Sequence, residues 1–406
     1  MEVDNKKNDE NIIPNDADKP QKGVNVPNLR FKEFNNLWTK LSLNSIVDRV
    51  TRKNLKNESN LPLTISAQYG LINQNEFFNK QIASRDLSNY ILIKKGEFAY
   101  NKSYSSEYPW GTVKRLNNHD KGVISSLYIC FSPKSIVNSD FLVHYFESSK
   151  WYNEISNIAG EGARNHGLLN MSVADYFQTT HIFPSLQEQQ KIATFLDLID
   201  QRIDTQSKII EDLECQINYI RRKLFTGYIN DDVNNQKYIF NKIFISYKKL
   251  NEQSLQQYTI GKNGIKSMSN HLNYSINSHI VFMPNTLILG IGIDEIGVSI
   301  DTTGCCSPIY KTYTINNEIV DTLFLNIFAN DYFSMIKNRV TQKSTRREFE
   351  FDYKELAKTL FTLPDIEIQK KDAQIVNKFY FKLQKEKDIL ELYRKQKAYL
   401  LKNMFI

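Results

Sequence analysis

The chain has 406 residues, of which 41% are hydrophobic and 12% aromatic, and this is enough apolar material for two or more packed domains. Its formal net charge is +7, a mild excess of base that suits a nucleic-acid partner without proving one. No run approaches the roughly 18 apolar residues of a membrane span, the N-terminal residues lack an apolar signal segment, and none of the four cysteines has CxxC spacing. We therefore expect a cytoplasmic protein with reduced thiols.

The first part of the chain divides into a polar tail and a mixed α/β domain. Residues 1–26 are polar and are predicted to be disordered. Residues 27–183 are predicted to form the first domain, in which Gly, Asn, Pro and Ser separate short strand-like runs. These runs are Leu61–Ser66, Tyr90–Ile93, Glu97–Asn101, Gly111–Leu116 and Val123–Phe131. Residues 140–157 have one apolar face and predict a helix, and the glycine-rich loop 160–172 follows it.

A long helix is predicted over residues 184–229. Its apolar residues recur in alternating steps of four and three, the spacing that keeps one stripe on one side of a coiled-coil helix. The stripe consists of Ile192, Leu196, Ile199, Ile203, Ile210, Leu213, Ile217, Ile220 and Leu224, with Gln206 at a skipped position between Ile203 and Ile210. The residues outside the stripe are mainly charged or amide, so the stripe needs a partner.

The second part of the chain repeats the first. Adding 180 to each number maps the first long helix onto residues 363–406 without a gap, with identities such as Pro184 to Pro364 and Gln189 to Gln369. The second seam comprises Val376, Phe379, Leu383, Glu386, Leu390, Tyr393, Leu400 and Met404, and two further positions are the polar Asp372 and Lys397. Residues 230–362 are predicted to form a second mixed α/β domain. Repetition at a long fixed period is a strong sign of duplicated structure.

These patterns predict an α/β (α+β) protein with a pseudo-two-fold internal repeat: two mixed α/β domains and two long antiparallel coiled-coil helices. The simplest packing places one globular unit at each end of the helix pair. In that packing Gln206 and Glu386 should meet near the middle of the seam. A polar pair there would fix the register of the helices at some cost in stability.

The sequence offers no catalytic or metal-binding constellation. The phosphate-binding pattern GxxxxGK[ST] and HxxxH pairs are absent, and the glycines of LGIGIDEIG, at positions 290, 292 and 297, favour a hairpin with close backbone approach over a dinucleotide site. Asp365 and Glu367, after Pro364, are interpreted as a helix start with acid in its first turn, not as a nuclease carboxylate set. The chain is therefore predicted to bind and position, with no catalytic residues and no metal of its own.

Candidate binding residues are cations, aromatics and amides in loops and hairpins. The run YNKSYSSEYPWGTVKRLN interleaves aromatics with cations, which can hold phosphates and offer groups to base edges; an exposed hairpin with cross-strand aromatic pairs is the simpler alternative. The predicted DNA-binding residues are Tyr100, Lys102, Tyr104, Trp110, Lys114, Arg115, Arg164, Asn165, His166, Lys262, Asn263, Lys266, Lys311, Lys343, Arg346 and Arg347.

Several of these motifs together resemble the specificity (S) subunit of type I restriction–modification systems. They are PNLRFKEF at residue 27, the YNKSYS run with GVISSLYICF after it, and FPSLQEQQKIATFLDLIDQRI leading into the first long helix. LPDIEIQKKDAQIV at residue 363 is the second copy of that helix start, with Glu367-Ile368-Gln369 in place of Gln187-Glu188-Gln189. The resemblance covers nearly the whole chain from residue 27.

The resemblance implies two target-recognition domains that each read one half of a split, asymmetric DNA site, with the helices fixing the gap between the halves. It also implies partners: two modification subunits that methylate adenine N6 with S-adenosylmethionine, and restriction subunits that use ATP and Mg to move and cleave DNA. The chain itself would need no cofactor. Two alternatives stay open, namely a stand-alone DNA-modifying enzyme and a coiled-coil scaffold with two protein-binding heads.

Overall fold

A computed structural model describes residues 25–80, 83–160, 167–230, 235–250, 255–262, 264–268, 279–292, 294–342 and 350–406. The chain forms two compact units. Unit 1 comprises Met1–Asp204 with Glu391–Ile406, and unit 2 comprises Thr205–Leu390. Both units mix helices and strands, so the predicted α/β class is confirmed. Each unit contains one segment of each long helix, whereas the sequence pattern treated the helices as separate spacers.

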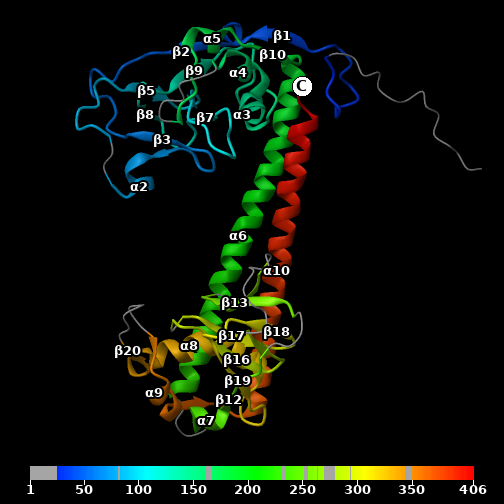
Figure 1. Cartoon of the computed structure of the whole chain (residues 1–406). Coiled ribbons are helices and arrows are strands. Elements are labelled where there is room, and N and C mark those ends of the chain that lie inside the picture. The colour runs from blue at the N-terminus through cyan, green and yellow to red at the C-terminus, as the bar shows by residue number, and fades with distance from the viewer. Residues whose placement is uncertain are drawn as a thin grey trace, which may run out of the picture. The chain divides into compact units, whose positions relative to one another are not determined.

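The two long helices are present close to their predicted bounds. They are α6, Leu186–Asn230, and α10, Ile366–Asn403. Asp365 accepts a hydrogen bond at 2.9 Å from the backbone N–H of Glu367, which confirms that this acidic pair begins a helix. Within each unit the segments of α6 and α10 pack side by side in opposite directions (Figure 1).

Unit 1 is built on a four-stranded sheet with the order β2-β9-β6-β7, and β1 pairs separately with β10. Its elements are β1 (Thr39–Ser42), α1 (Leu43–Ile46), β2 (Val47–Val50), β3 (Leu63–Ser66), β4 (Gly70–Asn73), α2 (Gln74–Phe78), β5 (Ile91–Lys94), β6 (Phe98–Asn101), β7 (Thr112–Arg115), β8 (Lys121–Ile124), β9 (Ile129–Pro133), α3 (Ser139–Glu147), α4 (Tyr152–Ile158), α5 (Val173–Gln178) and β10 (Thr180–Phe183). An aromatic core, which includes Phe98, Phe131 and Phe141, joins the sheet to α3 and to the first turns of α6.

The single helix predicted over residues 140–157 is wrong, because the chain forms α3 and α4 with a break between them. The Ser148 hydroxyl donates to the carbonyl of Tyr145 at 2.6 Å and so competes with the continuing helix. The Trp151 indole then donates to the carbonyl of Phe146 at 3.0 Å and fills the corner. The break keeps the apolar periodicity, so the pattern alone did not reveal it.

Unit 2 repeats this plan with a four-stranded sheet in the order β12-β19-β16-β17 and a separate pair, β11 with β22. Its elements are β11 (Gln236–Ile239), α7 (Phe240–Ile243), β12 (Phe244–Tyr247), β13 (Gln257–Gly261), β14 (Gly264–Ser267), β15 (Ile280–Phe282), β16 (Thr286–Leu289), β17 (Ile296–Ser299), β18 (Gly304–Cys306), β19 (Lys311–Ile315), α8 (Thr322–Val340), β20 (Thr341–Gln342), β21 (Glu350–Phe351), α9 (Tyr353–Lys358) and β22 (Leu360–Leu363). The hairpin predicted around LGIGIDEIG is confirmed by the antiparallel pairing of β16 with β17. A Cβ at Gly297 would lie 2.7 Å from Ile265, so the close approach is also present.

One glutamine near the start of each long helix attaches that helix to its unit in the same way. Gln189 donates to the carbonyl of Pro184 at 2.9 Å and accepts from the N–H of Asn138 at 2.8 Å. Gln369 donates to the carbonyl of Pro364 at 2.8 Å and accepts from the N–H of Asp321 at 3.0 Å. Both glutamines are buried, so these bonds form away from water. The second long helix is therefore attached to its unit by the same glutamine contacts as the first, although Glu367 and Ile368 replace Gln187 and Glu188.

The helix seam is buried or half-buried at all of its described positions. In unit 1 Ile192, Leu196, Ile199 and Ile203 join Leu400 and Met404 in the aromatic core. In unit 2 Ile210, Leu213 and Ile217 pack with Phe379, Leu383 and Leu390, while Ile220, Leu224 and Val376 join the second large core. The predicted meeting of Gln206 and Glu386 is confirmed: the Gln206 amide donates to the Glu386 carboxylate at 2.6 Å and to its carbonyl at 3.1 Å.

Candidate nucleic-acid interface

Tyr100 is a core residue, so its predicted role in binding DNA is wrong. It lies on β6, is fully buried and stacks on Tyr176 with ring centroids 4.8 Å apart. Its hydroxyl donates to the carbonyl of Trp110 at 2.8 Å, and burial raises its pKa well above the usual range. The error arises because β6, which forms a hairpin with β7, is covered on both faces: Phe98 and Tyr100 join the aromatic core, and Ala99 joins a second core.

Arg115 is held inside unit 1 by groups of its own chain. Its guanidinium donates to Asp140 at 2.7 Å, to the Ser139 hydroxyl at 2.8 Å and to Asn117 at 2.7 Å. These contacts attach β7 to the first turn of α3. A DNA phosphate could bind the Arg115 guanidinium only by replacing some of these hydrogen bonds, so Arg115 is assigned a structural role. Trp110 is half-buried against the aromatic core, and Tyr104 is half-buried with its N–H bonded to the carbonyl of Gly167.

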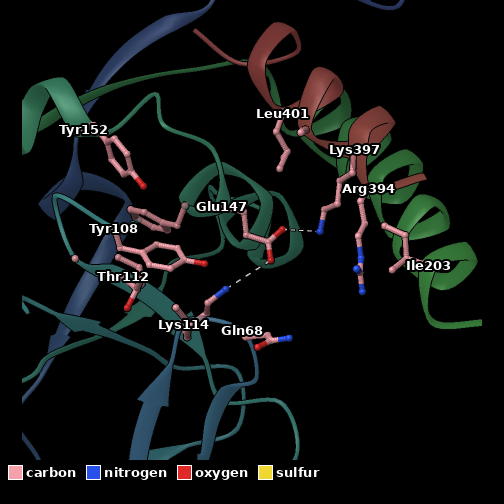
Figure 2. Close-up of a pocket in the computed structure, with 15 residues that line it drawn as sticks. Gln68, Tyr108, Thr112, Lys114, Glu147, Tyr152, Ile203, Arg394, Lys397 and Leu401 are labelled. Atoms are coloured by element: carbon pink, nitrogen blue, oxygen red, sulfur yellow. Dashed lines mark ion pairs between the residues drawn. The ribbon is translucent and has the colours of Figure 1, made fainter. Parts of the chain in front are cut away.

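Lys114 borders a pocket of about 310 Å³ that is lined by β7, α3 and the facing segments of α6 and α10. Figure 2 shows Glu147 between Lys114 and Lys397; the nitrogen–oxygen distances of the two ion pairs are 3.8 Å and 2.8 Å. Lys397 also contacts Asp200 at 2.6 Å, and the buried His144 lies beside both carboxylates. Lys397 is one of the two seam positions of α10 that are polar where α6 has an apolar residue. Its ion pairs with Glu147 and Asp200 attach this part of α10 to the rest of unit 1.

The charges of this cluster balance one another. Burial opposes ionisation of Glu147, but His144, Lys397 and Lys114 outweigh burial and hold its pKa well below the usual range. Burial likewise opposes the charge of Lys397, yet Glu147 and Asp200 raise its pKa. Ligand atoms of His144, Glu147 and Asp200 lie within 4.8 Å of one another, a spacing that could hold a metal ion. The ammonium group of Lys397 already lies between the two acids, and Lys114 adds a second positive charge beside Glu147.

A second hollow in unit 1 brings the predicted Lys102 together with two cations that the sequence had not revealed, Arg49 and Lys53. It has a volume of about 260 Å³, and Arg49, Lys53 and Lys102 line it together with the exposed Leu127. Arg49 and Lys53 are exposed, and Lys102 is half-exposed. The carbonyl of Lys102 accepts a hydrogen bond at 3.0 Å from the N–H of Leu169, which belongs to the glycine-rich segment 160–172. Arg49 lies on β2, and only the fold brings it near Lys102, more than 50 residues away in the sequence.

The candidates in unit 2 lie on two separate sheets. Lys262 follows β13 and is 82% exposed, with its ammonium group 3.3 Å from Asp294, and Lys266 is exposed on β14. Lys311 lies on β19, with its ammonium group 5.7 Å from the ring centroid of Tyr353. The other predicted residues lie outside the described part of the chain: Arg164, Asn165, His166, Asn263, Lys343, Arg346 and Arg347.

Comparison with known proteins gives three informative matches, although no family model matches the chain. The chain is 26% identical over 138 residues to the type I restriction enzyme EcoKI specificity subunit of Escherichia coli (strain K12). That region is 34% of this chain and spans 28% of the curated relative's length.

Two solved structures are similar over nearly the whole chain. The crystal structure of a type I restriction–modification S subunit from M. genitalium has a TM-score of 0.55 at 18% identity, covering 94% of this chain and 99% of that one. A chain from a study of complex assembly and conformational transition of the type I system has a TM-score of 0.52 at 12% identity, covering 91% and 97%. Among the described residues, no helix combines the length and apolarity needed to cross a membrane. The chain thus has the fold of type I S subunits and, over a third of its length, resembles one in sequence.

Proposed function

We propose that this chain is the DNA-specificity subunit of a type I restriction–modification complex and recognises a bipartite, asymmetric DNA site. The observation that carries the proposal is the duplication. Two units share the strand order of their main sheets and the glutamine attachment of their long helices, yet present different cations: Arg49, Lys53 and Lys102 in one, and Lys262 and Lys266 in the other. Two similar readers with unlike surfaces suit a site whose halves differ.

The proposed mechanism separates affinity from sequence reading. Exposed lysines and arginines neutralise phosphates and give salt-dependent, sequence-blind binding. Loop side chains then read base edges in the major groove, where each good bidentate contact contributes roughly 1–3 kcal/mol of discrimination. The long helices fix the gap between the half-sites, because a helix is a rigid spacer of fixed rise per residue.

In this proposal the chain has no catalytic role of its own. Two modification subunits would supply adenine-N6 methylation with S-adenosylmethionine, and restriction subunits would use ATP and Mg. The adenine to be methylated must leave the base stack, and the pocket that receives it would belong to the modification subunit.

A gel-shift assay over a salt series tests DNA binding by the chain alone. The triple variant Arg49→Gln, Lys53→Gln and Lys102→Gln should weaken binding and make the salt slope shallower by about three phosphate contacts, or roughly 2.7 units. Replacement of three helix lysines by glutamine, at Lys370, Lys382 and Lys395, is the matched control for lost charge. Equal effects of both variants, or no shift at all, would favour the protein scaffold. Turnover of DNA by the purified chain, given metal and methyl donor, would favour the stand-alone enzyme.

A further inference from the structure

Unit 2 has an apolar groove between the last turns of α6 and the first turns of α10. Its volume is about 660 Å³. It is lined by Tyr219, Ile220, Lys223, Leu224, Gly227, Tyr228, Asn235, Pro364 and Ile368. Tyr219 is 67% exposed and Ile368 is 45% exposed, which is unusual for large apolar side chains that face the same hollow.

The internal repeat shows what fills the matching place in unit 1. There the segment 27–34 lies across the end of α10 and the start of α6. The N–H of Leu29 donates to the carbonyl of Asn403 at 2.9 Å, and Arg30 makes a bidentate pair with Glu188 at 2.7 Å. Phe31 packs edge-on against Phe195 with ring centroids 5.8 Å apart. The segment contributes a backbone bond, an ion pair and an aromatic contact.

Of the residues that hold this segment, two correspond at the interval of 180 to residues that line the groove, and the third to a residue further along α10. Asn403 corresponds to Lys223, Glu188 to Ile368, and Phe195 to Ile375. The residues of unit 1 that the segment 27–34 covers are more buried than their counterparts in unit 2, where the groove is open. Glu188 is 1% exposed and Met404 is 4% exposed, whereas Ile368 is 45% exposed and Leu224, the counterpart of Met404, is half-buried.

The differences between the copies specify the chemistry of the occupant. Ile368 replaces the carboxylate that binds Arg30, so an arginine at that point would be left unpaired and an aliphatic residue would be favoured. Lys371 corresponds to Lys191, which pairs with Glu33 in unit 1, so an acidic residue is favoured three positions later. Lys223 lines the groove, Lys371 follows Ile368 by three residues on α10, and both lysines are exposed.

We infer that the groove of unit 2 docks a short extended segment of a partner protein. That segment carries an aliphatic residue, then an aromatic residue, then an acidic residue two positions further on. This differs from the segment 27–34 of this chain mainly by an aliphatic residue in place of Arg30. A second copy of the chain is therefore a poor occupant, because its own arginine would lie against Ile368. The inference does not depend on DNA recognition.

Two labelled peptides test the inference on the full-length chain by fluorescence anisotropy. One peptide has the sequence of residues 25–36 and the other carries Arg30→Leu. The groove of unit 1 stays closed to both, because its own segment is tethered at high effective concentration. The Arg30→Leu peptide should bind saturably and at least about tenfold more tightly than the native peptide. Ile368→Glu should reverse this preference.

Gly227→Trp provides the blocking control. A Cβ at Gly227 has no neighbour within 4 Å, so the indole can enter the groove without displacing the backbone, and binding should be lost. Hydrogen exchange at Tyr219–Tyr228 should slow on addition of the Arg30→Leu peptide in the unmodified chain only. No saturable binding up to millimolar peptide, or equal binding to the Gly227→Trp variant, would overturn the inference. Tighter binding of the native peptide would point to a second copy of the chain and would overturn it too.

Discussion

The contact between Gln206 and Glu386 allows a quantitative test of the seam. Gln206 is 7% exposed, and its amide makes two hydrogen bonds to Glu386, one of them to the carboxylate. Gln206→Leu alone removes a hydrogen bond to a charged group, which costs about 1.5–3 kcal/mol and is only partly offset by the apolar side chain. Replacing both residues by leucine removes the stranded carboxylate and extends the Ile210, Leu213 and Leu383 cluster. The double variant should then gain about 1–4 kcal/mol over the unmodified chain.

The measurement is a double-mutant cycle by chemical denaturation. Hydrogen exchange of the amides around Leu213 and Leu383 would report on unit 2 itself, since a chain with two units need not unfold in one step. Gln216→Leu, on the exposed face of α6, is the matched control and should change stability by less than about 0.5 kcal/mol. If the double variant is less stable than the unmodified chain, the Gln206–Glu386 pair stabilises the seam. The hypothesis that this pair fixes the register of the helices and lowers their stability is then refuted.

Three further outcomes follow. His181 is buried between Tyr145 and Thr179, and burial lowers its pKa to about 4. As the pH falls, this imidazole is therefore protonated in the unfolded chain before it is protonated in the folded chain. Stability should therefore fall by about 1.4 kcal/mol per pH unit from about pH 6.5 down to pH 4; denaturation of His181→Gln should show a shallower slope, and an unchanged slope contradicts this. Lys397→Met should cost about 2–4 kcal/mol, because Asp200 loses its lysine and Glu147 keeps only Lys114 at 3.8 Å; the exposed Lys395→Met is the control, and equal melting temperatures of the two variants would argue against the cluster. Exchanging residues 27–183 for those of a related protein should change one half of the methylated sequence in cells, and a change in both halves would contradict two independent readers.

The long helices were predictable because their signal is local and periodic. The alternating steps from Ile192 to Leu224 and the repeat at an interval of 180 fixed the helix pair and the meeting of Gln206 with Glu386. Helix propensity could not locate the break between α3 and α4 at Ser148, where the serine hydroxyl donates a hydrogen bond to the carbonyl of Tyr145. Nor could propensity separate Tyr100 from exposed aromatics, because both faces of β6 are covered only once the strand is packed in the fold.

The candidate interface was only partly predictable for the same reason. Lys102 was identified from its aromatic surroundings, but Arg49 and Lys53 come from another strand and loop and join it only through the fold. Arg115 looked like a free cation in sequence, yet Asp140 and Asn117 take up its donors. A basic residue in a hairpin does not reveal whether its partner is a phosphate or a carboxylate of its own chain.

The Lys397 cluster makes the two halves of the chain dependent on each other. At the corresponding place in the first half stands Ile217. A dimer made from two copies of the first half would therefore bring an isoleucine to Glu147 and Asp200; Asp200 would lose its lysine, and Glu147 would keep only Lys114, 3.8 Å away. Separating the two halves of the chain would part Glu147 and Asp200, which belong to the first half, from Lys397, which belongs to the second and pairs with both.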